Sequence, residues 1–248
     1  MITINKTSVV ETKEIGNGTV IDEFCVIRKN VVVGKNVHVY PHVVIFDGCI
    51  IGDNTRLYPG TLIGKIPDGA GALARTPSFS RHVSIGSNCA IGPNAVVYYD
   101  VEIGKNTLIG DAASIRENCN IGSYTIIGRH VCVNYECTIG NHTKIMDFAV
   151  LESAVVGDDV FISMHVSTAN DNKFYLRKYD SRVDLGPKID DHASIGENAT
   201  LLPNIRIGRW SLVGAGSVVT KDVPEKAVVM GVPAKIVRYL DDIKGEYK

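Results

Sequence analysis

Carboxylate and imidazole side chains recur through the middle of the chain at intervals of 17–19 residues, at Asp111, His130, Asp147 and His165. Such groups act as general bases or acids near neutral pH and can remove a proton from an incoming nucleophile. Glu136 lies between two of them and adds another carboxylate. We therefore predict that the catalytic residues are His130, Glu136, Asp147 and Asp111, provided that the fold brings them together.

A period of six residues runs through most of the chain. It is visible from Ile15 in IGNGTV, IDEFCV and IRKNVV, and again from Ile85 in IGSNCA and IGPNAV. The first position is Ile, Leu or Val, the second is very often Gly, the fourth is rich in Asn, and the fifth is small. Because Asn tolerates the left-handed backbone of a tight corner, we expect one corner per repeat, with positions one and five buried.

A period of six matches neither a strand, with a period of two, nor an α-helix, with a period of 3.6. It predicts short strands that turn a corner every six residues, three to a triangular coil, with stacked coils supplying a core that no single repeat can bury. Residues 18 apart should then lie about 4.8 Å apart on one edge. The same spacing predicts that Asp111, His130, Asp147 and His165 form a polar ridge and that Asn134 stacks against Glu152.

Composition limits the possible functions of the chain. With 26 basic and 27 acidic residues among 248, the formal net charge is −1, so we expect no general attraction to nucleic acid or anionic membranes. No window approaches the roughly 20 apolar residues of a membrane helix, and the N-terminus lacks a signal-peptide pattern, so the expected location is cytoplasmic.

The six cysteines form no CxxC pair, so no zinc or redox motif is implied. Five of them occupy the small fifth position of the repeat, which predicts a core-filling role. They are Cys25, Cys49, Cys89, Cys119 and Cys137, whereas Cys132 is at the sixth position.

The repeat breaks at residues 65–82 and at about 168–194. Loops that interrupt a regular repeat often carry function. Basic side chains in them could meet phosphates and an aromatic ring could stack on a base, although both segments can equally be solvated loops. From Gly231 onward, a proline turn predicts a short helix that caps the last coil.

This repeat resembles that of the hexapeptide-repeat acyltransferase family over roughly residues 10–235. The resemblance implies an all-β fold, a left-handed parallel β-helix of about nine coils. We expect it to span residues 1–230, with the two insertions at about 65–82 and 168–194, and a C-terminal helical cap over 231–248. The resemblance also implies a homotrimer with active sites between subunits.

The segments Val213–Pro224 and Met230–Lys235 are similar to the ending common in hexapeptide acetyltransferases, where this region holds coenzyme A. Carried over, backbone groups of three small residues would face the pantetheine arm, and three basic residues would lie near the phosphates. The predicted cofactor-binding residues are Gly214, Ala215, Gly216, Lys221, Lys235 and Arg238.

The segment Lys144–Ile162, followed by Ser167–Asp171, resembles the branch of this family that N-acetylates amino sugars linked to UDP or dTDP. Many members of that branch carry Asn at the place of Asp147. The resemblance implies that acetyl-CoA, or another short acyl-CoA, is the co-substrate, and that the amine of the sugar attacks the thioester directly, without a metal. The predicted substrate-binding residues are Asn134, Glu152, His165, Asn170 and Arg177.

Other functions stay open from the sequence. An O-acetyltransferase acting on serine or a sugar hydroxyl could use His130 or His142 as its base. The same fold hosts γ-type carbonic anhydrases, but His130 and His142 fall on different corners and no histidine pair has the short spacing of that zinc site. A non-catalytic scaffold is a further alternative, against which the two polar loops and the Gly-Ala-Gly-Ser run argue.

Overall fold

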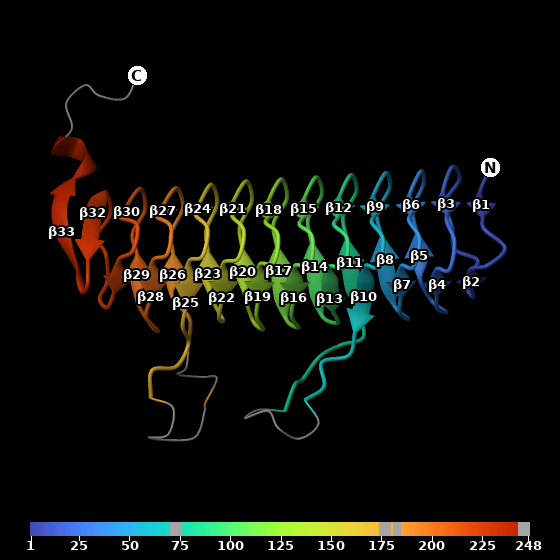
Figure 1. Cartoon of the computed structure of the whole chain (residues 1–248), viewed down its shortest axis with the longest axis horizontal. Coiled ribbons are helices and arrows are strands. Elements are labelled where there is room, and N and C mark those ends of the chain that lie inside the picture. The colour runs from blue at the N-terminus through green and yellow to red at the C-terminus, as the bar shows by residue number, and fades with distance from the viewer. Residues whose placement is uncertain (70–75, 174–179, 181–184, 243–248) are drawn as a thin grey trace.

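The structure is a computed structural model that describes residues 1–69, 76–173, 180 and 185–242. Very short strands wind into a straight, triangular solenoid, with the two ends of the chain at its opposite ends (Figure 1). The strands form three sheets of 13, 11 and nine strands, one for each side of the triangle. The predicted all-β, left-handed parallel β-helix of hexapeptide repeats is confirmed.

The first sheet contains β1 (Thr3–Ile4), β3 (Val20–Ile21), β6 (His38–Val39), β9 (Arg56–Leu57), β12 (Ala90–Ile91), β15 (Leu108–Ile109), β18 (Ile126–Ile127), β21 (Lys144–Ile145), β24 (Phe161–Ile162), β27 (Ser194–Ile195), β30 (Leu212–Val213), β32 (Ala227–Gly231) and β33 (Ala234–Tyr239). All pairs are parallel except β32 with β33. The 13 strands minus β33 leave twelve in parallel register, so the solenoid has about twelve coils.

The second sheet contains β2 (Val9–Val10), β4 (Val26–Ile27), β7 (Val44–Ile45), β10 (Leu62–Lys65), β13 (Val96–Tyr98), β16 (Ser114–Ile115), β19 (Cys132–Val133), β22 (Val150–Leu151), β25 (Ser167–Thr168), β28 (Thr200–Leu201) and β31 (Val218–Val219). The third contains β5 (Val32–Val33), β8 (Cys49–Ile51), β11 (Val83–Ile85), β14 (Val101–Ile103), β17 (Cys119–Ile121), β20 (Thr138–Ile139), β23 (Val155–Val156), β26 (Lys188–Ile189) and β29 (Arg206–Ile207).

Two expectations about the limits of the repeat were wrong. The expected nine coils are too few, because β1 and β2 already belong to the solenoid before Ile15. The second insertion ends earlier than residue 194, because β26 pairs with β23 and β29 from Lys188 onward. The repeat IDDHAS, which starts at Ile189, has Asp instead of Gly at its second position, and this concealed it.

The C-terminal helix was also predicted wrongly. Residues 227–239 form an antiparallel hairpin of β32 and β33, and Leu240–Asp242 form a 3₁₀ turn at the end of the described residues. The hairpin extends the first sheet beyond the last coil, as the red end of Figure 1 shows. It therefore covers the open edge that a helix was expected to cover.

The core consists of the first and fifth positions of the repeats. Ile109, Ile127 and Ile145 stack on successive coils and are fully buried. The five cysteines at the fifth position are buried and none is in a disulfide. Burial raises the pKa of the Cys49 thiol to about 12. This thiol therefore stays protonated near neutral pH and contributes packing rather than reactivity.

The left-handed backbone at each corner explains why Asn is frequent at the fourth position of the repeat. Asn36, Asn54 and Asn88 stack there with φ of 53°, 57° and 59°, in the left-handed region that Asn tolerates. Their side-chain amides also hydrogen-bond to one another from coil to coil at 3.2 Å. Each corner thus combines a tolerated backbone conformation with a polar contact to the next coil.

The second position carries Gly because the next coil lies directly against it. A Cβ at Gly110 would lie 2.5 Å from the carbonyl carbon of Gly128, and one at Gly122 would lie 2.5 Å from that of Gly140. Real Cβ atoms do not approach backbone atoms so closely, and the backbone cannot move without breaking the coil-to-coil hydrogen bonds. The absence of a side chain at this position therefore permits the stacking distance.

We predict that Gly110→Ala lowers the free energy of unfolding by about 1–3 kcal/mol, because the added methyl group has only backbone to displace. Gly214→Ala is the matched control: it is also a second-position glycine, but its Cβ would meet the flexible Met230 side chain. Urea unfolding monitored by circular dichroism should show the larger loss for Gly110→Ala. Equal losses would contradict this account of the second position.

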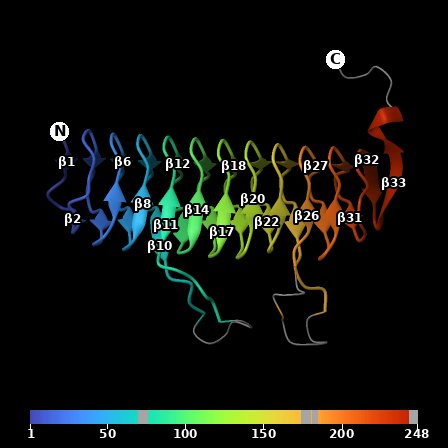
Figure 2. The same ribbon diagram turned by 180° about the vertical axis from the view of Figure 1, so that it is seen from behind.

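Both insertions leave the solenoid on the same side. One joins β10 to β11 and the other joins β25 to β26, so each replaces a corner between the second and the third sheet. From behind, both still project from the same long edge (Figure 2). We call this edge, formed by the corners between the second and third sheets, the loop edge.

Candidate functional site

The predicted histidine stack exists, on the edge between the first and second sheets, here called the histidine edge. His130, Phe148 and His165 lie on successive coils, with ring centroids 5.0 and 5.1 Å apart and nearly parallel planes. Both imidazoles are exposed. The stacking predicted from the six-residue period is therefore confirmed. Stacking alone assigns no catalytic role to these side chains.

Asp147 also lies on the histidine edge, but its carboxylate is fully engaged. Its Oδ1 accepts the backbone N–H of Arg129 at 2.8 Å, and its Oδ2 accepts Nε and Nη2 of the same residue at 2.9 and 2.5 Å. These bonds from Arg129 hold the pKa of Asp147 below its usual range. A carboxylate so well satisfied is a weak base.

The same contact recurs where no chemistry is expected. Oδ1 of Asp53 accepts the backbone N–H of Lys35 at 2.7 Å, and Oδ1 of Asp191 accepts that of Asp158 at 3.0 Å. An acidic third position thus links a corner to the coil before it. For Asp147, this structural contact explains the residue more simply than general-base catalysis does.

We predict that Asp147→Asn lowers the urea midpoint at pH 7, by about 0.5–1 kcal/mol of unfolding free energy, because the ion pair is lost while an acceptor remains. The folded-state pKa of Asp147 is lowered, so this stabilisation is present above the ordinary aspartate pKa of about 3.9 and is lost as pH falls through the lower folded-state value. Wild type and variant should therefore converge once the pH lies below the folded-state pKa of Asp147.

The control for this prediction is Asp111→Asn. Asp111 lies one coil earlier on the histidine edge and is exposed, and its carboxylate accepts no hydrogen bond from the residues that the structure describes. Its variant should keep the wild-type midpoint. An unchanged midpoint for Asp147→Asn would refute the structural role.

Glu136, Asn134 and Glu152 lie on the loop edge, across the triangle from the histidine stack. Glu136 is an exposed corner residue with φ of 61°. Asn134 and Glu152 stack as predicted, with Asn134 Nδ2 donating to Glu152 Oε1 at 2.6 Å. The predicted catalytic set is thus divided within one chain: His130, Asp147 and Asp111 lie on one edge and Glu136 on another.

Glu152 differs from the other carboxylates of the loop edge. Its side chain is half-buried, and this burial raises the pKa of its carboxyl against the opposing effects of Asn134 and of the Arg116 charge. Its Oε2 has no partner among the described residues. The structure thus offers a proton acceptor whose pKa is shifted toward neutral pH and whose second oxygen is available.

The second insertion begins and ends over Glu152. At its start, Asn170 Nδ2 donates to Tyr135 Oη at 3.0 Å and approaches Ser153 Oγ at 3.5 Å. At its end, a Cβ on Gly186 would lie 2.0 Å from the Glu152 carbonyl oxygen, so the two backbones are in direct contact. The predicted residue Asn170 therefore belongs to this site, whereas Arg177 lies outside the described residues.

The first insertion folds back onto the same edge. Ser80 binds both oxygens of Asp100, at 3.0 Å through its N–H and at 2.7 Å through its hydroxyl. Asn118 Nδ2 donates to the carbonyl oxygen of Ser78 at 2.9 Å. The polar corners of the loop edge therefore anchor one loop at Asp100 and Asn118 and the other near Glu152.

A buried ion pair on this edge was not predicted. Arg116 donates through Nε and Nη2 to the two carboxylate oxygens of Glu117 at 2.9 and 3.3 Å, and the Glu117 side chain is fully buried. The Arg116 guanidinium also lies over the Tyr98 ring, 5.0 Å from its centroid. The spacing of 18 residues between Tyr98, Arg116 and Asn134 could have placed them together.

The residues predicted to bind coenzyme A do not form one cluster. Gly214, Ala215 and Gly216 form the last corner of the histidine edge, beside the hairpin, and Gly231 N–H donates to Ser217 Oγ at 3.1 Å. Lys235 and Arg238 lie on β33 of that hairpin and are exposed. Lys221 lies on the loop edge instead.

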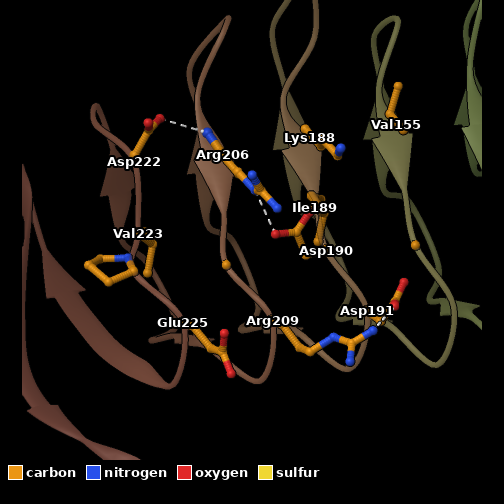
Figure 3. Close-up of a pocket in the computed structure, with 13 residues that line it drawn as sticks. Val155, Lys188, Ile189, Asp190, Asp191, Arg206, Arg209, Asp222, Val223 and Glu225 are labelled. Carbon is orange, nitrogen blue, oxygen red and sulfur yellow. Dashed lines mark hydrogen bonds and ion pairs between the residues drawn. The ribbon is translucent and has the colours of Figure 1, made fainter.

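A cavity of about 770 Å³ lies on the outer face of the third sheet near its C-terminal end. Arg206 Nε donates to Asp190 at 2.7 Å, and its backbone N–H donates to Asp222 at 2.8 Å, as the dashed lines in Figure 3 mark. Arg209 pairs with Asp191. The arginines of this cavity are thus neutralised by acidic neighbours on adjacent coils.

The described residues contain neither a metal-binding cluster nor a membrane-spanning helix. No group of three or more His, Cys, Asp or Glu side chains is placed to hold a metal ion in that part of the chain. None of its helices has both the length and the apolar character needed to cross a membrane.

The model of the family described as bacterial transferase hexapeptide (six repeats) matches residues 12–47, 82–113 and 186–221. Serine acetyltransferase 4 of Arabidopsis thaliana is 40% identical over 91 residues, 37% of this chain and 24% of that protein. Galactoside O-acetyltransferase of Escherichia coli K12 is 33% identical over 98 residues, 38% of this chain and 48% of that protein. 2,3,4,5-Tetrahydropyridine-2,6-dicarboxylate N-acetyltransferase of Staphylococcus aureus is 42% identical over 60 residues, which are 24% of this chain and 25% of that protein.

Among solved structures, UDP-N-acetylglucosamine acyltransferase of Francisella novicida is 23% identical, with 98% of this chain and 71% of that chain covered and a TM-score of 0.49. GDP-perosamine N-acetyltransferase of Caulobacter crescentus, in complex with CoA and GDP-perosamine, is 27% identical, with coverages of 60% and 55% and a TM-score of 0.39. This chain spans about a quarter to a half of the length of the curated relatives above. By its repeats, the chain is similar to the bacterial transferase hexapeptide family, whose model matches parts of the solenoid.

Proposed function

We propose that this protein transfers an acetyl group, or another short acyl group, from coenzyme A to the amine of an amino sugar linked to dTDP or UDP. The curated relatives support the general reaction, because all three are named acetyltransferases although their named acceptors differ. The acceptor must therefore be argued from the polar site of this chain. The observation that carries the proposal is the half-buried Glu152 carboxylate between the two loops.

An acceptor amine is protonated near neutral pH and cannot attack until it loses a proton. In the proposed reaction, Glu152 Oε2 accepts that proton while Asn134 holds Oε1. The neutral nitrogen attacks the thioester carbonyl, a C–N bond forms, and the C–S bond breaks as the tetrahedral intermediate collapses. The proton held by Glu152 then passes to the departing thiolate, which restores the carboxylate. The second proton, which the nitrogen loses as the amide forms, goes to solvent, so atoms and charge balance.

The donor-binding part of the proposal rests on the family resemblance. Gly214, Ala215 and Gly216 would face the pantetheine arm, and Lys235 and Arg238 on β33 would meet its phosphates. Lys221 lies on a different edge from these residues, so within one chain it cannot complete the same phosphate site. A homotrimer with active sites between neighbours is part of the proposal, and light scattering tests it.

The direct test is thiol release from acetyl-CoA with a panel of dTDP- and UDP-linked amino sugars, followed by mass spectrometry of the products. We expect a mass gain of one acetyl group on a nucleotide amino sugar and none on the matching hydroxyl sugar. If the hydroxyl analogue is acetylated instead, the reaction is O-acylation and not the proposed N-acylation. Coenzyme A binding without transfer to any of these acceptors would refute the proposed acceptor class.

Glu152→Gln should lower kcat by about 10²–10⁴-fold, because the amide keeps the shape of the side chain but accepts no proton from an ammonium group. Glu136→Gln is the matched control, since Glu136 is a neighbouring but exposed glutamate of the loop edge. It should keep kcat within about twofold. Equal losses in the two variants would contradict the assignment of the base to Glu152.

The pH profile gives an independent check. Because the pKa of Glu152 is raised by burial, activity should be present above this raised pKa and fall as the pH drops through it. The acidic limb of kcat/KM should therefore lie above the usual glutamate pKa of about 4.3. Asn134→Ala removes a hydrogen bond that favours the charged carboxylate, so it should move this limb to higher pH.

O-acylation is the second candidate, because one curated relative is named an O-acetyltransferase and exposed imidazoles are present on the histidine edge. In that case, His130→Gln or His165→Gln would abolish turnover and Glu152→Gln would not. The same three variants thus distinguish the two reactions.

A further inference from the structure

Five outward-facing side chains form a single row beside the loop edge. Lys65, Tyr98, Arg116, Asn134 and Glu152 follow or end strands of the second sheet on five successive coils, and the register of β10, β13, β16, β19 and β22 aligns them. The row begins at the first insertion and ends beneath the second. We call it the polar row.

The two ends of the polar row carry opposite charges. Lys65 Nζ donates to Tyr98 Oη at 2.9 Å and lies 4.7 Å from the ring centroid, and Arg116 lies over the same ring. Two cations thus share one aromatic ring at the end near the first insertion. At the other end, Glu152 is the acidic group, with Asn134 between it and the cations.

Arg116 is held in place by a group that has no access to solvent. Glu117 is fully buried and binds Arg116 through both carboxylate oxygens. A buried carboxylate is costly, and replacing such a pair by apolar residues is often neutral or stabilising. Fixing Arg116 in this way leaves Nη1 without a partner among the described residues. The guanidinium is therefore oriented rather than merely neutralised.

The spacing of the coils sets the distances between the residues of the polar row. With about 4.8 Å per coil, Arg116 lies about 10 Å from Glu152 and Lys65 about 19 Å from it. A ligand that spans the row must therefore present an anionic group to the cations and an amine to the carboxylate, about 10 Å apart. Phosphate oxygens suit this cationic end, because guanidinium and ammonium groups bind them through charge-assisted hydrogen bonds.

We propose that Lys65, Tyr98 and Arg116 form the subsite for the diphosphate of the nucleotide-linked acceptor, and so orient the acceptor with its amine toward Glu152. The amine end of this inference rests on the proposed function, whereas the phosphate end stands by itself. A simple amino sugar without a phosphate would bind poorly, because it reaches only one end of the polar row.

The test is binding of UDP and dTDP, which have the diphosphate but no amine, measured by isothermal titration calorimetry. Lys65→Met should weaken binding about tenfold, because one charge-assisted contact from an exposed side chain is lost. Lys105→Met is the matched control: Lys105 is also exposed, but it lies on a corner between the third and first sheets. It should bind like the wild type.

Coenzyme A also carries phosphates, so its binding is measured with the same variants. Weaker binding of coenzyme A with unchanged binding of UDP and dTDP would assign the cations to the donor and overturn the inference. Unchanged binding of all three ligands would overturn it as well, as would a wild type that binds neither nucleotide. Arg116→Lys, which keeps the charge but loses the two-pronged contact with Glu117, should weaken UDP binding in the same direction as Lys65→Met.

The result is separable from the proposed function. In turnover assays, Lys65→Met should raise KM for the nucleotide amino sugar about tenfold with kcat little changed, because Lys65 contacts no reacting atom. If no amino sugar is acetylated but UDP binding depends on Lys65, the phosphate subsite stands and the reaction is wrong. If amino sugars are acetylated and the affinity for UDP is the same in wild type and Lys65→Met, the reaction stands and the subsite is wrong.

Discussion

Everything in this protein depends on the backbone hydrogen bonds that link each coil to the next. They require a coil to close in about 18 residues, because the strands of one sheet must return in parallel register at about 4.8 Å. A chain can make three sharp corners in that length only if one residue at each corner takes a left-handed conformation. Asn, Gly and other residues with positive φ occupy those places along the whole solenoid.

The same requirement decides where chemistry can be placed. Strand positions alternate between the core and solvent, so each coil presents only a few outward side chains, and these stack on their counterparts one coil away. A longer segment fits only where a corner can be opened, and both insertions open corners on the loop edge. Between their anchor points, at Ser80 and Asn170, lie the stacked polar residues. The repeat thus creates the row and the insertions flank it.

This division also explains what could be predicted from the sequence. The period of six placed His130, Phe148 and His165 in one stack, and Asn134 against Glu152, because stacking depends only on counting residues. Counting residues could not show that Arg129 pairs with the Asp147 carboxylate, because that depends on side-chain conformation. It failed entirely for the C-terminal hairpin, where the repeat has ended and a proline turn is compatible with either a helix or a strand.

Burial separates the functional candidates from the structural ones better than residue type does. Asp147, Glu136 and Glu152 all carry carboxylates, but that of Asp147 is paired with Arg129 and that of Glu136 is exposed. Glu117 instead has a fully buried carboxylate and Glu152 a half-buried one, and burial of a charge opposes folding unless a partner compensates. Glu117 has Arg116 as that partner, whereas Glu152 has only the neutral Asn134 at one oxygen. A cationic amine at the other oxygen would supply the missing charge, so the unfavourable burial of Glu152 in the free protein becomes favourable binding in the complex.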